Sequence, residues 1–183
     1  MNKETATITC EALFNKDKTH RYALTKTWDT KKPLATVISI APGPDYNVAA
    51  DLTTQLIQNN LVGLGFGGFT LCNLLSKVGA DLKRLASTDG LHDRETDKMI
   101  TAACEAADAV ILAWGKGIAK NKTLDKRARD VVALVTPFAE KLHCIADSAG
   151  RTELHPITPS VRHNWALVKA ELPDHAPAEA QTA

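Results

Sequence analysis

Four continuous apolar runs recur along the chain, and each ends in glycine, proline or a polar residue. They occupy residues 34–40, 69–75, 109–115 and 141–146. Short runs rich in β-branched residues are typical of strands buried on both faces, as in a parallel sheet. The pattern therefore predicts four core strands.

Segments with helical spacing separate these runs. We predict helices over 49–61, within 89–108 and through 129–138, and a last short helix over 161–171. Alternating strands and helices are typical of a parallel sheet with helices on both faces. The expected fold class is α/β, a three-layer α/β/α sandwich with a mainly parallel central sheet of about four strands.

The N-terminal region has a different pattern. Residues 20–28 alternate loosely between apolar and polar positions, and residues 7–13 precede them. This pattern favours a hairpin of two strands. We expect one domain over residues 1–172, followed by an Ala/Pro-rich tail over 173–183 that is disordered.

Composition narrows the class of protein. The chain is 44% hydrophobic and 23% charged, and it has no apolar run near the ~20 residues that a membrane span needs. The N-terminus lacks the apolar core of a signal peptide, so we expect a cytoplasmic protein with no membrane partner. Four cysteines lie far apart with no C-x-x-C pair, and we expect reduced thiols and no metal.

The carboxyl ends of parallel strands predict where a ligand binds, because ligands of such sheets lie outside those ends. The loops after Ile40, Leu75, Trp114 and Ala146 are therefore the candidate site. The chain has no G-x-G-x-x-G after a strand, no GK[ST] loop, no G-x-S-x-G and no H-E-x-x-H. We expect no cofactor.

Several residues near these loops have two interpretations. Asn73 is either a satisfied core amide or a reader of a ligand edge, and Trp114 is either core or part of the site. The Pro42-Gly43 turn and the loop residue His155 are individually unspecific. A basic run over 116–129 holds six lysines and arginines against one acid, and it favours either phosphate contacts or a solvated helix face.

The order of these motifs is more informative than any one of them. Ile-Ala-Pro-Gly follows the first core strand, Asn73 ends the second, Ala-Trp-Gly ends the third, and His155-Pro156 follows late. This series resembles the uracil-DNA glycosylase superfamily. More closely, residues 20–170 resemble a bacterial and phage family of unknown function. The matching positions are Arg21-Tyr22, Trp28, the Pro42 loop, Asp51, Thr53, Asn73-Leu74, Ala113-Trp114-Gly115, Gly150 and His155-Pro156.

The resemblance implies a DNA glycosylase-like protein that flips and excises, or binds, a damaged or modified base, in repair or phage defence. Asn73 would read the base edge, His155 would stabilise the departing base, and Asp45 or Asp51 would orient water or balance the sugar cation. The implied contacts to DNA are Pro42, Gly43, Trp114, Gly115, Lys116, Lys120 and Arg162.

Two departures from these patterns leave other functions open. Ala41 stands where the family of unknown function has asparagine before proline, and Ile157 stands where the glycosylases have serine after His-Pro. A nucleoside- or nucleotide-processing enzyme would use the same strand-end pocket. A catalytically inactive nucleic-acid-binding protein of this fold is the other alternative.

Overall fold

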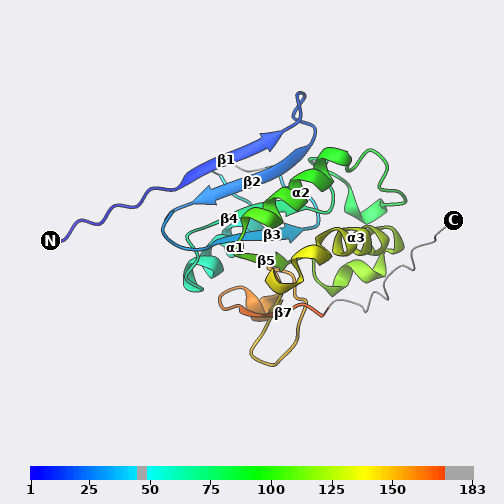
Figure 1. Cartoon of the computed structure of the whole chain (residues 1–183). Coiled ribbons are helices and arrows are strands. Elements are labelled where there is room, and N and C mark those ends of the chain that lie inside the picture. Colours follow the sequence, from blue (N-terminus) through cyan, green and yellow to red (C-terminus); the bar gives the residue numbers. More distant parts are fainter. Residues whose placement is uncertain (45–48, 172–183) are drawn as a thin grey trace.

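The computed structural model describes residues 1–44 and 49–171. Within them, one seven-stranded sheet has the order β1-β2-β4-β3-β5-β6-β7 (Figure 1). The strands are β1 (Thr9–Phe14), β2 (Arg21–Thr27), β3 (Leu34–Ser39), β4 (Gly68–Asn73), β5 (Ala109–Leu112), β6 (Leu142–Ala146) and β7 (Ala166–Lys169). The α-helices are α1 (Leu52–Gly63), α2 (Arg94–Ala106) and α3 (Lys122–Val135). The expected tail at 173–183 lies outside the described residues.

The four predicted core strands are present as β3, β4, β5 and β6, and neighbouring pairs among them are all parallel. The prediction of a mainly parallel sheet of about four strands is wrong, because three antiparallel pairs extend the sheet at both edges. On one side the N-terminal hairpin adds β1 and β2 beside β4. The alternating, half-exposed pattern of β1 is typical of an antiparallel edge strand.

The predicted last helix over 161–171 is also wrong. A short 3-10 turn at Pro159–Val161 is followed by β7, which pairs antiparallel with β6. Its four residues, Ala-Leu-Val-Lys, include good helix formers, so propensity alone favours the wrong element. Pairing with the open edge of β6 satisfies their backbone groups instead.

The helices cover both faces of the sheet. Side chains of the parallel strands alternate between a cluster with α2 and α3 and a cluster with α1. Figure 1 shows α2 and α3 on one side of the strands and α1 on the other. The first cluster includes Ile38, Cys72, Val110, Ile100 and Val131, and the second includes Val37, Leu71, Ile111, Ile57 and Leu61.

Each α-helix begins with a side-chain cap. Asp51 accepts from Thr54 N at α1, Asp93 accepts from Thr96 N at α2, and Asn121 caps α3. These caps satisfy backbone N–H groups that have no partner inside the helix. None of the helices in the described part of the chain combines the length and apolar character needed to cross a membrane.

Candidate functional site

The loops after β3 and β4 and the loop that carries His155 meet at the carboxyl edge of the parallel strands. They enclose a cavity of about 410 Å³, here called the edge pocket. This volume lies within the range of small-ligand sites. Its lining includes Arg21, Ser39, Pro42, Gly43, Asp51, Thr54, Asn73 and His155. Five of the expected site residues therefore share one cavity, although they come from four separate segments.

Asn73 is the last residue of β4, and its side chain is a buried polar group of the edge pocket. The residue is 3% exposed, and its amide makes no hydrogen bond to another described residue. Buried amides are normally paired, so an amide without a protein partner at a cavity wall is a candidate ligand contact. This position supports the interpretation of Asn73 as a ligand contact.

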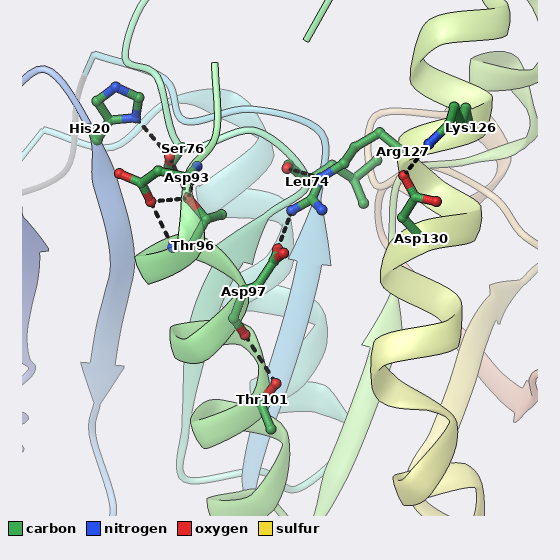
Figure 2. Close-up of polar contacts among 10 residues, drawn as sticks. All are labelled: His20, Leu74, Ser76, Asp93, Thr96, Asp97, Thr101, Lys126, Arg127 and Asp130. Atoms are coloured by element: carbon green, nitrogen blue, oxygen red, sulfur yellow. Dashed lines mark hydrogen bonds and ion pairs between the residues drawn. The ribbon is translucent and has the colours of Figure 1, made fainter. Parts of the chain in front are cut away.

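The backbone after Asn73 is held from both sides (Figure 2). Arg127 Nε donates to the carbonyl of Leu74 at 2.9 Å, and Arg127 also pairs with Asp97 at 2.5 Å. Ser76 Oγ lies 2.8 Å from His20 Nδ1 and 2.7 Å from Thr96 Oγ1. Hydrogen bonds to α2, α3 and the start of β2 therefore fix the segment that positions Asn73.

Arg21 enters the edge pocket because the alternation of β2 is interrupted. Leu13 pairs with Ala23 while Phe14 pairs with Arg21, which leaves Tyr22 as the extra residue of a bulge. Tyr22 turns toward α2 and donates to Asp93, whereas Arg21 donates to the carbonyl of Gly43 at 3.3 Å. Burial lowers the pKa of Arg21, and nearby Asp51 opposes that shift. The sequence pattern included Arg21 but gave it no role in the site.

Asp51 joins the cap of α1 to the loop after β3. Its Oδ1 accepts from Thr54 N at 2.7 Å. A Cβ built on residue 43 would lie only 2.3 Å from its Oδ2. A side chain at Gly43 would displace this carboxylate. Thr54 Oγ1 is buried and has no hydrogen-bond partner in the described part of the chain. The second predicted carboxylate, Asp45, lies outside the described residues.

His155 lines the edge pocket, and a backbone N–H determines which ring nitrogen carries the proton. The N–H of Ile157 donates to His155 Nδ1 at 3.2 Å, so a neutral ring carries its proton on Nε2. Burial lowers the pKa of His155, which favours that neutral form. Gly115 permits this placement, because its φ is 74° and a Cβ there would lie 2.9 Å from His155 Cβ.

The loop from β6 to His155 depends on Asp147, which the sequence interpretation missed. Asp147 is buried at the end of β6 and accepts from the backbone N–H groups of Ala149 and Arg151, each at 3.0 Å. Arg151 Nε adds a bond at 2.7 Å. The Asp-x-x-Gly-Arg spacing over residues 147–151 is compatible with a turn, and it is the signal that could have found Asp147.

The other predicted DNA contacts lie outside the edge pocket. Trp114, Gly115 and Lys116 line an adjoining cavity of about 580 Å³, here called the middle pocket, which His155 also lines. Lys120 is exposed on the 3-10 turn Lys116–Lys120. Arg162 donates to the carbonyl of Ile157 at 2.9 Å, so it braces the His155 loop.

Most of the basic run is neutralised by neighbouring acids. Lys116 pairs with Glu153 at 3.8 Å, Lys126 with Asp130 at 2.9 Å, and Arg129 with Asp125 at 2.7 Å. Arg127 is 4% exposed, pairs with Asp97 and donates to the Leu74 carbonyl. In the described part of the chain, two members of the run, Lys120 and Lys122, lie outside these ion pairs.

No grouping of three or more metal-ligating side chains occurs among residues 1–44 and 49–171.

No curated protein and no solved structure matches the chain, and nothing found links it to the uracil-DNA glycosylases. A family model described as a protein of unknown function, DUF1643, matches residues 21–157. The chain thus belongs to the DUF1643 family, whose matched region contains β2 through His155 and all the walls of the edge pocket.

Proposed function

We propose that the edge pocket binds a nucleobase and that the protein is a DNA glycosylase-like hydrolase of N-glycosyl bonds. The observation that carries this proposal is the Asn73 amide, which is buried, lacks a partner among the described residues and lines one cavity with His155. An amide offers both donors and an acceptor, as the edge of a base requires. A neutral His155 adds a donor through Nε2–H.

The proposed reaction divides its charges between these groups. The C1′–N bond breaks with its electron pair on the base, and hydrogen bonds from His155 and Asn73 stabilise that charge. Water adds to C1′, and its proton passes to the base or to solvent. The Asp51 carboxylate, next to Gly43, balances the positive sugar. Because Oδ1 of Asp51 caps α1, only Oδ2 is assigned to this role.

The test is base release from oligonucleotides that each carry one damaged or modified base, as single strands and as duplexes. Chromatography detects the free base, and alkaline cleavage detects the abasic site. We expect release from one member of the panel. His155→Ala should slow it roughly a hundredfold to a thousandfold, the range for loss of an oxyanion-type donor. A panel without any release, using folded protein, would contradict the glycosylase assignment.

A second candidate is a nucleoside- or nucleotide-processing enzyme with the same pocket. It is favoured by the ion pairs within the basic run, which leave few charges for the phosphates of a duplex. The same panel distinguishes the two when free nucleosides and nucleotides are included. Release of the base from a free nucleoside or nucleotide, but from no oligonucleotide, would support this second candidate.

A further inference from the structure

A third cavity, here called the apolar pocket, lies between α3, the 115–119 turn and the ends of β5 and β6. Its volume is about 450 Å³, and it shares no lining residue with the edge pocket. Leu112, Ile118, Ala128 and Val132 supply much of its wall. Mostly apolar pockets of this size are typical of small-molecule sites.

Trp114 gives this pocket an aromatic wall. The residue is partly exposed and lines both the apolar pocket and the middle pocket. Indole rings stack favourably with other flat rings, beyond the gain from burying their area. The Cys144 thiol also lines the pocket, and burial raises its pKa, so it adds a neutral group.

The charged residues of the lining carry a small net negative charge. Lys116 pairs with Glu153 and Arg129 pairs with Asp125, so these four charges cancel. Glu171 is the remaining charged residue of the lining, and two cations against three acids give a net charge of −1. An anion would enter against this charge, with partial desolvation.

We propose that the apolar pocket is a second ligand site, which takes a flat aromatic ring that is uncharged or singly positive and excludes phosphates. The proposal does not depend on the function assigned to the edge pocket. It gives Trp114 a role in stacking on a ring, separate from any contact with DNA phosphates.

The test uses three probes of matched shape and different charge: 2-naphthalenemethanol, 2-naphthylmethylammonium and 2-naphthoate. Each is titrated into the full chain while NMR follows the methyl groups of Ala128 and Val132 and the indole N–H of Trp114. We expect the neutral and cationic probes to shift these signals. The anionic probe should bind at least about tenfold more weakly, since like charge disfavours its entry.

Two variants locate the binding. Val132→Phe fills the pocket from α3, and Ala119→Phe fills it from an exposed position of the turn, so one remains informative if the other misfolds. Each should abolish the shifts of the Ala128 methyl and the Trp114 indole N–H, which both variants retain, whereas Ala133→Phe, at an exposed position of the same helix, should preserve them. Equal binding of naphthoate, or shifts that survive both filled variants, would overturn the proposal. So would binding that requires removal of residues 173–183, because the occupant would then be the chain itself.

Discussion

Asn73 is the residue on which the proposed site depends most, and its isolation makes a clean experiment. Because the amide has no partner among the described residues, Asn73→Leu removes the polar group without leaving another one unpaired. We expect the free energy of unfolding to change by less than about 1 kcal/mol, measured by urea denaturation. Base binding or release should be lost. If the stability falls by several kcal/mol, Asn73 is a structural amide after all.

His155 predicts a pH dependence of stability. Burial lowers its pKa in the folded state below the unfolded value of about 6.5, so the unfolded chain binds the proton more readily. Stability is therefore full above about pH 6.5 and falls as the pH drops through that value toward the folded pKa. His92, whose pKa burial also lowers, contributes with the same sign.

The measurement is urea unfolding at two pH values, one above and one below about 6.5. His155→Gln should reduce the loss of stability between them, and the double variant with His92→Gln should reduce it further. An unchanged difference in both variants would contradict the assignment of this pH dependence to burial of the two rings.

At the scale of elements, the contacts that Arg127 makes with Leu74 and Asp97 can be compared with those of its neighbour Lys126. Both residues form ion pairs from α3, but Arg127 is buried and also holds the Leu74 carbonyl, whereas the Lys126–Asp130 pair is exposed (Figure 2). Arg127→Met should cost about 2 to 3 kcal/mol, because it leaves a buried carbonyl unpaired and removes a charged hydrogen bond. Lys126→Met should cost less than about 0.5 kcal/mol. Equal costs would show that Arg127 does not hold the segment.

The sequence predicted the elements that periodicity and composition define. The four parallel strands and the N-terminal hairpin were recognisable because buried runs and alternation differ from each other. β7 was not recognisable, because four residues are too few to show a periodicity. Pairing with the edge strand β6 decides their conformation. The bulge that turns Arg21 into the site depends on register between two strands, which a single sequence does not contain.

At the scale of the whole molecule, the position of the site at the edge of the sheet was predictable from the sequence. The net charge of the basic run was not. Parallel strands bring their carboxyl ends together, so the meeting of Pro42, Asn73 and His155 followed from topology. The basic run was interpreted from residues next to one another in sequence. Two of its acids come from other segments, Asp97 of α2 and Glu153 of the His155 loop, whereas Asp125 and Asp130 lie on α3 itself. Only the fold reveals the pairs with Asp97 and Glu153, because the other two join residues four apart on one helix.

That pairing sets the expected salt dependence of DNA binding. Two lysines outside the ion pairs, Lys120 and Lys122, would contact about two phosphates, and each contact contributes roughly −0.7 to −0.9 to the slope of log K against log salt. We therefore expect a slope of about −1.4 to −1.8, whereas all six basic residues of the run acting together would give about −4.2 to −5.4. Fluorescence anisotropy with a labelled oligonucleotide across a salt series measures this slope.

Two double variants test which lysines and arginines set the slope. Lys120→Ala with Lys122→Ala should bring the slope close to zero, and Lys126→Ala with Arg129→Ala should leave it unchanged. A slope that the second pair reduces would mean that the ion pairs open to receive phosphates, and absence of binding at low salt would favour the small-molecule candidate.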